Sequence, residues 1–299
     1  MKFIDPSVAW WPMKDFAQHI ADVGRICYKS EGKLPDPGLD GEERKAFLHE
    51  RDMLRSKSFW ESGHRSMFRH ATAYFFVPNE KQLHTTLVWS LMVASPYISY
   101  AVKGSKVWIS TNLQFLCEQE QLKNMLMPFQ IDEEEFIRRA VKAKCNAALW
   151  LLRMTFVVTT QISTSRELNR TSPNAIAEQS TRYCNLEKKG GVQIAEPEWY
   201  HAGTRRQRFL YRTACRFSSW IYTRLLRAGL QPQDARGILP LDTYTVVAYT
   251  YNLNEWKHII DLRFNETTGK AHPNAKYVCG VIRGIIIGRM REYIPDFDI

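Results

Sequence analysis

Three arginines lie among carboxylates and hydroxyl groups in the segment formed by residues 165–185. The arginines are Arg166, Arg170 and Arg182, and the other polar residues of interest are Glu167, Glu178, Ser180 and Tyr183. Guanidinium groups make bidentate hydrogen bonds to phosphate, while serine hydroxyls and glutamate carboxylates suit a sugar or the edge of a base. These residue types suit a nucleotide site, but a solvent-exposed loop held by ion pairs explains the composition equally simply.

A second segment, residues 235–263, carries Arg236 before a Leu-Pro turn and then Asn252, His258 and Arg263 in a stretch with helical character. Eleven residues separate Asn252 from Arg263. This is about three turns of an α-helix, so a continuous helix would place both on one face. The arginine would either bind an anion or interact with the dipole at the C-terminal end of that helix.

Two histidines, His64 and His70, precede a β-rich stretch in a third segment. Their six-residue spacing is not a helical metal-ligand pattern, and a purely structural role is the alternative to a role in a site. The six cysteines are scattered without a CxxC pair, which indicates free thiols rather than a zinc site. We therefore expect no metal site.

The common signatures of nucleotide-binding proteins and hydrolases are absent from the sequence. There is no GxGxxG after a strand, no GxxxxGK(S/T) and no GxSxG. Any phosphate would have to be bound by arginine side chains and scattered backbone N–H groups.

The composition is that of a globular protein: of 299 residues, 44% are hydrophobic and 24% are charged, which excludes a disordered chain or a fibre. Lysine and arginine number 41 against 31 aspartate and glutamate, and the resulting charge of +10 favours anionic ligands. No apolar run approaches the roughly 20 residues that a bilayer span needs, and the N-terminus lacks the apolar core of a signal peptide. We expect a cytoplasmic protein without membrane association.

Hydrophobic periodicity predicts the elements that must position these residues. Helices are expected over residues 14–27, 41–55, 82–92, 132–152, 204–228, 253–262 and 274–291, and strands over residues 71–77 and 154–162. The apolar stripe of the longest helix consists of Leu210, Ala214, Phe217, Ile221 and Leu225. Gly229 is expected to end this helix. The excess of helix over strand predicts an α+β fold, a single domain over residues 1–299 with a small mixed or antiparallel sheet flanked by long helices.

A nucleic-acid-binding protein is an alternative from another class, because the helix expected over residues 204–228 carries seven arginines. Such proteins combine clustered cations with interleaved aromatic residues or a known module, and no module signature is present. Arginine-lined nucleotide sites explain the same charge, so nucleic acid is the less favoured partner.

Taken in order, the three segments resemble the flavin-dependent thymidylate synthases. The third segment, Gly63-His64-Arg65-Ser66 through His70, is similar to the family's GHxSxxEH stretch. The segment 165–185 aligns Arg170 and Ser180 with the first Arg and the Ser of a signature that reads RHR, seven residues, Ser, and it continues as Thr181-Arg182-Tyr183. The segment 235–263 matches the family's closing pattern at Ala235-Arg236, Leu239-Pro240, Thr250, Asn252, His258 and Leu262-Arg263. Residues 95–97 and 109–113 also resemble a stretch of the longer members, and the likeness covers about residues 60–291.

The resemblance implies the conversion of dUMP to dTMP. Methylenetetrahydrofolate would supply the carbon, and NADPH would supply a hydride through FAD. It also implies an α+β fold and a homotetramer with active sites between subunits.

Residue roles follow from the same resemblance, position by position. The positions that would bind dUMP are Glu167, Glu178, Ser180, Thr181, Arg182, Arg236 and Arg263. Arg263, beside the pyrimidine, and Ser180 would be catalytic, since a guanidinium near the uracil carbonyl groups stabilises developing enolate charge. The positions that would face the flavin are His70, Arg170, Thr171, Ser172, Glu178, Asn252 and His258.

The chain departs from the family pattern mainly at the flavin positions. Thr171 and Ser172 replace the His and the second Arg of the signature, Arg69 stands where Glu is usual, and Asn254 stands where Arg is common. The nucleotide half is nearly complete while the flavin half is eroded. The alternatives to an active divergent enzyme are therefore a homologue with other flavin or folate chemistry on a pyrimidine nucleotide, and an inactive nucleotide-binding relative.

Overall fold

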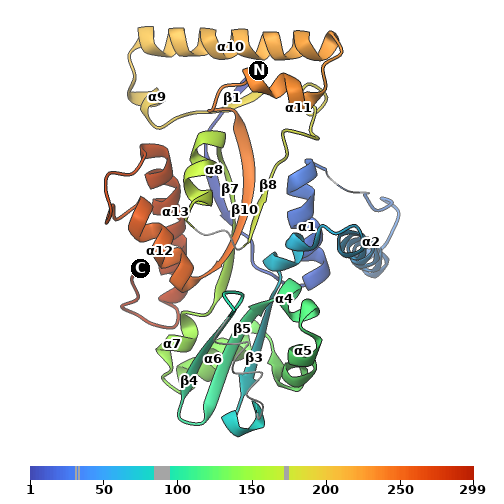
Figure 1. Cartoon of the computed structure of the whole chain (residues 1–299), viewed down its shortest axis with the longest axis vertical. Coiled ribbons are helices and arrows are strands. Elements are labelled where there is room, and N and C mark those ends of the chain that lie inside the picture. The colour runs from blue at the N-terminus through green and yellow to red at the C-terminus, as the bar shows by residue number, and fades with distance from the viewer. Residues whose placement is uncertain (31, 33, 84–94, 172–174) are drawn as a thin grey trace.

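A four-stranded antiparallel sheet lies at the centre of the protein (Figure 1). The computed structural model describes residues 1–30, 32, 34–83, 95–171 and 175–299. In spatial order the central strands are β2 (Ser7–Trp10), β7 (Arg153–Gln161), β10 (Tyr244–Asn252) and β8 (Ile176–Glu178). β7 and β10 pair along nine residues, so these two long strands form the centre of the sheet.

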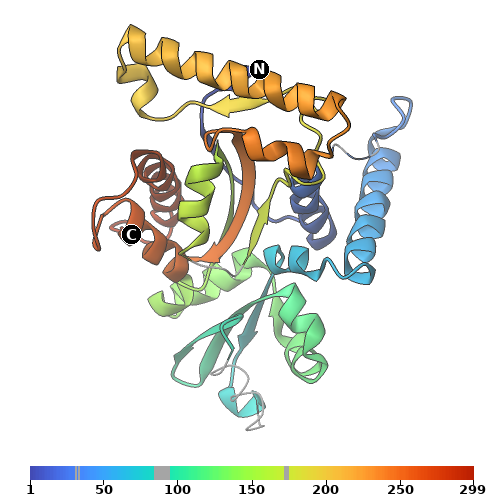
Figure 2. The same ribbon diagram turned by 45° about the horizontal axis from the view of Figure 1, so that its top comes forward.

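The two faces of the central sheet are covered by different helices, as Figure 2 shows. Helix α1 (Phe16–Tyr28) packs Ile20 and Val23 on the face that carries Val157 and Ala248. The other face, with Phe156 and Tyr249 among its residues, is covered by α8 (Ile162–Asn169), α12 (Leu253–Arg263) and α13 (Pro273–Met290). Because side chains alternate along a strand, neighbouring residues of β7 or β10 belong to different layers of the protein.

A second antiparallel sheet forms the lower half of the molecule in Figure 1. Its strands, in order, are β4 (Ile98–Lys103), β5 (Lys106–Asn112), β3 (Thr72–Val77) and β6 (Gln130–Ile131). The helices around it are α4 (Leu113–Glu118), α5 (Glu120–Leu126), α6 (Glu133–Lys142) and α7 (Asn146–Leu149). The short 3-10 helices of this half are η1 (Arg65–His70), η2 (Glu80–Leu83) and η3 (Met127–Phe129). The largest hydrophobic cluster joins residues of both sheets, from Tyr74 and Trp108 to Phe156 and Trp256.

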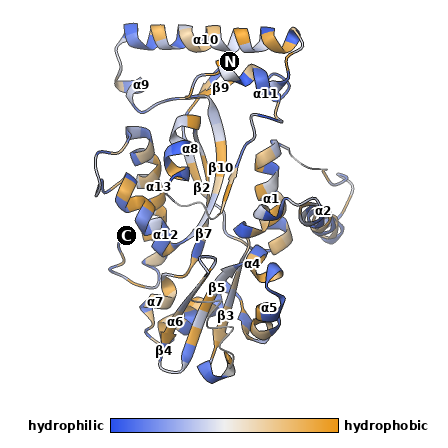
Figure 3. Cartoon of the chain, viewed as in Figure 1, coloured by the Kyte–Doolittle hydropathy of each residue, from blue (hydrophilic) through white to orange (hydrophobic). Residues whose placement is uncertain are grey.

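The long helix α10 (Arg205–Arg227) lies across the end of the molecule opposite the second sheet. Beneath it are the parallel pair β1 (Lys2–Ile4) and β9 (Gln193–Ala195) and the short helices α9 (Trp199–Ala202), α11 (Pro232–Ala235) and η4 (Arg236–Ile238). The side chains that α10 buries are Cys215, Ser219 and Tyr222. Leu210 and Phe217, from the expected apolar stripe, are instead 57% and 63% exposed. Figure 3 shows hydrophobic residues along this outer helix.

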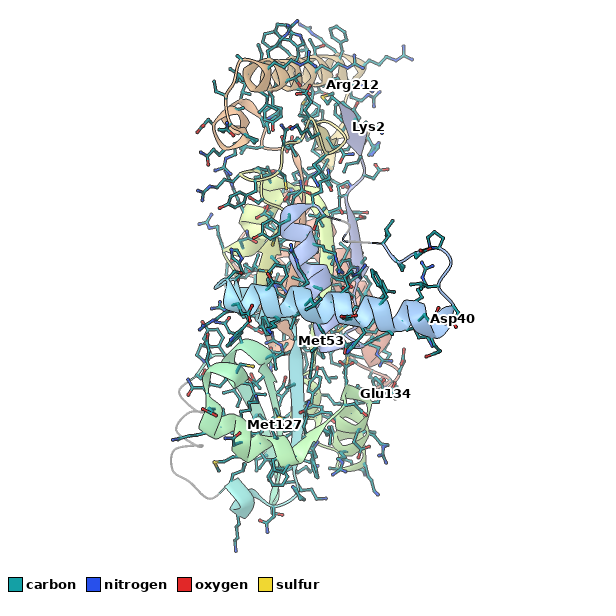
Figure 4. All side chains as sticks on the ribbon, turned by 90° about the vertical axis from the view of Figure 1, so that its right-hand side faces the viewer. Lys2, Asp40, Met53, Met127, Glu134 and Arg212 are labelled. Atoms are coloured by element: carbon teal, nitrogen blue, oxygen red, sulfur yellow. The ribbon has the colours of Figure 1, made fainter. Side chains whose placement is uncertain are left out.

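Helix α2 (Gly41–Glu61) crosses the side of the molecule next to α1, as Figure 4 shows. Asp40 begins the helix with a capping box, in which its carboxylate accepts from the N–H of Glu43 while the Glu43 side chain accepts from the N–H of Asp40. The absence of a side chain at Gly24 lets α1 approach Phe59 of α2, whose ring occupies the place a Cβ atom would take. This close approach holds the two helices together over η1.

The predicted fold class is confirmed: the protein is α+β, with small, mainly antiparallel sheets and long helices. The strand 71–77 and the strand 154–162 are present as β3 and β7, and five expected helices correspond to α1, α2, α10, α12 and α13 within a few residues, α2 running six residues longer. As expected, α10 begins after the N-cap residue Thr204 and is followed by Gly229, which adopts a left-handed conformation with φ +96°.

Three other expectations about the elements were wrong, and a fourth lies mostly outside the described residues. The helix expected over 132–152 divides into α6 and α7, because Lys144 adopts a left-handed conformation with φ +51° and the N–H of Cys145 bonds back to Ala140. Residues 244–252, where no strand was expected, form the central strand β10. The helix expected over 82–92 falls largely outside the described residues. Asn252 is the N-cap of α12 rather than an interior helical residue, so it does not share a helix face with Arg263.

Candidate functional site

Arginines and hydroxyl groups from two distant segments meet where the chain leaves β8. Arg236 Nη1 donates to Thr181 Oγ1 at 2.9 Å, and Arg182 Nε donates to Gln233 Oε1 at 3.3 Å. Both guanidinium groups lie at the surface. The structure therefore brings together Thr181, Arg182 and Arg236, three of the residues expected to bind a nucleotide, and two cations there are free to turn toward a phosphate dianion.

A tight turn shapes this cluster. The N–H of Ser180 donates to the carbonyl oxygen of Cys27 at the end of α1 at 2.9 Å. The Ser180 hydroxyl in turn accepts from the N–H groups of Arg182 and Tyr183 at 3.2 and 3.3 Å. Ser180 therefore orients the arginine that follows it, and its hydroxyl proton is still available to a ligand.

Glu178, two residues earlier, accepts hydrogen bonds from three side chains. Its Oε1 accepts from Ser165 at 2.7 Å and Thr245 at 3.0 Å, and its Oε2 accepts from Asn169 at 3.3 Å. Asn169 Oδ1 accepts from the Tyr249 hydroxyl at 2.8 Å. The carboxylate is thus held in one orientation between α8 and β10.

Arg263, the last residue of α12, is fastened to α8. Its Nη2 lies 3.4 Å from Glu167 Oε2 and donates to the carbonyl oxygen of Glu167 at 3.1 Å. The side chain of Arg263 is 19% exposed and that of Glu167 39% exposed. The pair leaves part of the guanidinium edge at the surface, where it can reach a ligand.

The residues expected to face a flavin do not form one group in this chain. Arg170, which follows α8 as its C-cap residue, and His258 on α12 are exposed. Thr171 donates its hydroxyl to Leu168 O at 2.5 Å. Asn252 uses its Oδ1 to cap α12 and its Nδ2 to contact Ser99 at 3.4 Å. Ser172 lies outside the described residues.

His70, the remaining expected flavin contact, is fully buried on the other side of the central sheet. Its Nδ1 lies 2.8 Å from Thr250 Oγ1, and Thr250 Oγ1 lies 2.7 Å from Thr155 Oγ1. Thr155 Oγ1 lies 3.0 Å from His19 Nε2. His70 Nε2 has no hydrogen-bond partner among the described residues.

Burial disfavours the charged form of both histidines, and nearby cations add to this effect at His70. Burial, with further contributions from His19, Arg153 and Arg69, lowers the pKa of His70 well below its usual value. Burial also lowers the pKa of His19 to about 4. Arg153 is itself held in the interior, where Nη2 donates to the carbonyl oxygen of Arg69 at 2.8 Å and Nε donates to Thr72 at 3.2 Å.

The central sheet lies between His70 and the Glu178 and Arg263 groups. Thr250 and Thr155 are register partners on the face covered by α1, whereas Glu178 pairs with Val247 and points toward α8. Within one chain, the Glu178 and Arg263 groups therefore lie on the opposite face from His70.

Sequence reasoning missed several residues that complete these networks, namely His19, Arg153, Thr155, Ser165, Asn169 and Thr245. Polar residues inside otherwise apolar strands, such as Thr155 and Thr245, were the available signal. A buried polar group needs a partner, but the sequence does not reveal which one.

A cavity of about 760 Å³ lies beside these networks, between the start of α1 and the second sheet. Thr72, Tyr74 and Glu133 line it, together with Lys14 and Asp15. Burial raises the pKa of Glu133, which accepts a long hydrogen bond from Tyr74 at 3.4 Å. None of the residues expected from the sequence to bind nucleotide or flavin lines this cavity.

Three side chains also meet near the N-terminus: Asp5, Glu196 and His201. His201 Nε2 lies 3.3 Å from Glu196 and 3.9 Å from Asp5, and the side chains of Asp5 and His201 are largely exposed. This arrangement is a surface contact between one histidine and two carboxylates, and contacts of this kind contribute little to stability.

Comparison with known proteins places the chain in a family. Residues 90–285 match the thymidylate synthase complementing protein family, and this span is more than half of the chain. The chain therefore belongs to this family, that of the flavin-dependent thymidylate synthases. The match contains Ser180, Arg236 and Arg263, whereas His19 and His70 lie before its first residue.

Solved structures of a UMP/dUMP methylase, PolB from Streptomyces cacaoi, are similar to this chain at low identity. The structure with 5-Br dUMP is 16% identical, with a TM-score of 0.42, over 96% of this chain and 93% of PolB. The structure with 5-Br UMP is 22% identical, with a TM-score of 0.39, over 51% of this chain and 76% of PolB. A comparison with curated proteins gave no match. Among the described residues, no helix is both long and apolar enough to cross a membrane.

Proposed function

We propose that this protein methylates dUMP to dTMP. Methylenetetrahydrofolate supplies the carbon, and NADPH supplies a hydride through FAD. The observation that carries this proposal is the convergence of Arg182 and Arg236 around Thr181, directly after Ser180, in a chain of the thymidylate synthase complementing protein family. The UMP/dUMP methylase among the similar structures agrees with a pyrimidine nucleotide as substrate.

The two surface arginines would bind the phosphate of dUMP. Among the described residues, Arg182 donates to Gln233 and lies over the ring of Tyr183, and Arg236 donates to Thr181. The remaining N–H groups of both arginines can make the paired contacts that a dianion accepts. Ser180 and Thr181 would add hydroxyl contacts at the same end of the nucleotide. Glu178, locked by three donors, would orient the sugar.

Arg263 would act on the pyrimidine ring. A fixed guanidinium near the uracil carbonyl groups stabilises negative charge as it develops on the ring, and it costs no reorganisation if it is held beforehand. Glu167 provides that support through its carbonyl oxygen and carboxylate. Ser180 remains the second residue proposed to take part in catalysis.

The donor set of this chain suits a flavin only in part. Arg170 offers an exposed cation for a pyrophosphate and His258 an exposed ring, whereas the Thr171 hydroxyl is already bonded to Leu168 and the second signature arginine is replaced by Ser172. Bound flavin would carry the hydride between NADPH and the one-carbon group. We propose that Arg170, Asn252 and His258 contact it and that binding is weaker than in a chain with the full signature.

We also propose a single domain that works as a homotetramer with shared sites. The hydrophobic cluster that joins both sheets supports the single domain. The tetramer is supported by the exposed apolar residues of α10, with Phe209 at 67%, Phe217 at 63% and Trp220 at 50% exposure. A neighbouring subunit would also explain why His70 lies on the opposite face of the central sheet from Glu178 and Arg263 within one chain.

Calorimetry with dUMP tests the substrate assignment. Replacing Arg182 with alanine removes a charged hydrogen-bond donor and should weaken binding by roughly 1.5–3 kcal/mol. Arg138→Ala is the matched control, because Arg138 is an exposed arginine of α6 paired with Glu135. Equal dUMP binding by the wild type and Arg182→Ala would refute the assignment.

Product analysis then decides between the proposed reaction and the inactive relative that the replaced signature residues suggest. The wild type is incubated with dUMP, methylenetetrahydrofolate, NADPH and FAD, and dTMP is measured by chromatography. Binding of dUMP without formation of dTMP or oxidation of NADPH would favour a nucleotide-binding protein. Oxidation of NADPH without dTMP would indicate other flavin chemistry.

A further inference from the structure

A cavity of about 460 Å³ lies between the last turns of α1 and the second half of α2. Three arginines, Arg25, Arg51 and Arg55, contribute to its wall. Its other described lining residues are Ser30, Gly32, Leu54 and Ser58. None of these described lining residues is acidic, so the wall offers guanidinium groups to an anion.

Two of the three arginines are fixed from behind by carboxylates. Asp52, whose side chain is 4% exposed, pairs with Arg25 Nη2 and lies 2.9 Å from Arg51 Nε. Arg25 also pairs with Asp22 of its own helix. Because the carboxylates already hold these guanidinium groups in place, little side-chain freedom is lost when an anion binds.

Arg55 is held by aromatic rings instead. Its guanidinium carbon lies 4.6 Å from the ring centroid of Phe59 and 5.7 Å from that of Tyr28. Within the described part of the chain, the Arg55 side chain forms no hydrogen bond or ion pair. A cation–π contact fixes the position of the charge and leaves the N–H groups of the guanidinium available to an anion in the cavity.

Two tyrosine rings lead from this cavity to the residues proposed to bind dUMP. The ring centroids of Tyr28 and Tyr183 are 6.4 Å apart, and the guanidinium carbon of Arg182 lies 5.2 Å from the Tyr183 centroid. The N–H of Ser180 donates to the carbonyl oxygen of Cys27, which holds this turn against the end of α1. Tyr183 is 66% exposed. An exposed aromatic face between two cationic groups is a stacking surface for a planar ring.

We propose that the cavity and the rings of Tyr28 and Tyr183 bind a co-substrate that consists of a heteroaromatic ring and an anionic group. The ring stacks on Tyr183, and the anion enters the cavity and binds Arg55. The inference rests on the proposed function, whose two co-substrates both have this chemistry: a folate carries glutamate carboxylates, and NADPH carries a phosphate on its adenosine. All described residues that line the cavity precede residue 90, where the match to the family begins, so the family match does not assign this site.

Arg55→Gln is the informative variant of the cavity, because glutamine removes the cation and keeps a polar side chain. Arg44→Gln is its matched control, since Arg44 is an exposed arginine of the same helix outside the cavity. Tyr183→Leu removes the exposed ring, and Tyr277→Leu is its control, because Tyr277 is 44% exposed on α13. Arg55→Lys restores a cation. Thermal unfolding of each variant establishes that it is folded.

The first readout is calorimetric binding of two probes to the full chain, with dUMP and FAD in excess so that their own sites are filled. Adenosine 2′,5′-bisphosphate represents the phosphate-bearing end of NADPH, and 5-formyltetrahydrofolate represents the folate. Arg55→Gln should weaken binding of the recognised probe about ten- to a hundredfold, and Tyr183→Leu about tenfold. The two controls should bind as the wild type does, and Arg55→Lys should recover part of the affinity.

The two probes distinguish the sources of the ligand. Binding of the adenosine probe that depends on Arg55 assigns the site to NADPH, and binding of the folate probe that depends on Arg55 assigns it to the folate. Failure of both probes to bind the wild type, or equal binding by folded Arg55→Gln and the wild type, would overturn the site. This result does not depend on whether the protein makes dTMP.

The second readout is turnover of dUMP. In Arg55→Gln, the KM for the recognised co-substrate should rise at least tenfold, while kcat and the KM for dUMP change little. A rise in the KM for dUMP without a change for either co-substrate would place Arg55 in the dUMP site and overturn the inference. If the wild type makes no dTMP, the proposed function fails, and the probe titrations still decide the site.

Discussion

Replacing Glu178 with glutamine keeps the shape of the side chain and removes its charge, and the structure allows the cost to be worked out. The carboxylate accepts from the Ser165 and Thr245 hydroxyl groups and from the Asn169 amide. In the variant, the glutamine amide nitrogen faces one of these three donors, and the hydrogen bond from that donor is lost. The remaining hydrogen bonds are weaker because their acceptor is no longer charged. A hydrogen bond to a charged group contributes about 1.5–3 kcal/mol, so we expect a loss near 2 kcal/mol in the free energy of unfolding.

Calorimetric unfolding measures this loss. At roughly 2.1 cal/mol/K of unfolding entropy per residue, a chain of 299 residues changes by about 0.6 kcal/mol per degree, so the midpoint should fall by about 3 °C. Glu187→Gln is the control, because Glu187 pairs with Arg227 at the surface and its loss should cost well under about 1 kcal/mol. Equal midpoints for Glu178→Gln and the wild type would show that the three donors do not hold this carboxylate.

Three further outcomes are expected. FAD titration should show weak binding by the wild type. The double variant Thr171→His with Ser172→Arg should bind FAD about ten- to a hundredfold more tightly, since a charge-assisted contact contributes about 1.5–3 kcal/mol. Stoichiometric FAD in the purified wild type would contradict this prediction. Light scattering should give a mass near four times 34.9 kDa, and the double variant Phe217→Glu with Trp220→Glu should give smaller species; a wild-type monomer that makes dTMP would exclude shared sites. Burial lowers the pKa of His19 from 6.5 to about 4. Between these two pH values the unfolded chain therefore binds more protons than the folded chain. The stabilisation present above pH 6.5 is lost as the pH falls through about 4. Urea unfolding as a function of pH should show a smaller loss of unfolding free energy at low pH for His19→Gln than for the wild type. An equal loss in both proteins would show that other groups are responsible for the pH dependence.

The sequence was most informative where local chemistry decides the structure. Thr204 and Gly229 are suited to begin and end a helix, and α10 runs between them. The β-branched composition of residues 154–162 was sufficient to predict β7. The spacing of Ser180, Arg182 and Arg236 identified residues that do meet at the end of β8.

Predictions failed where burial and distant contacts decide. No strand was predicted over residues 244–252, although pairing with β7 along the whole strand makes them the central strand β10. The helix stripe of Leu210 and Phe217 was identified as apolar but lies on the surface of the chain, because Cys215, Ser219 and Tyr222 face the rest of the protein. Helical periodicity shows that a face is apolar, and it does not show what that face packs against.

The sequence by itself determined the family, the fold class and the residues able to bind an anionic nucleotide, because these depend on residue types and local spacing. Only the tertiary structure decided which face of the central sheet each residue occupies. Thr155 and Thr250 are 95 residues apart and become partners through the register of β7 and β10, with His19 and His70 added from α1 and η1. A shift of one residue in that register would turn the hydroxyl groups to the opposite face, and no local pattern in the sequence specifies such a pairing.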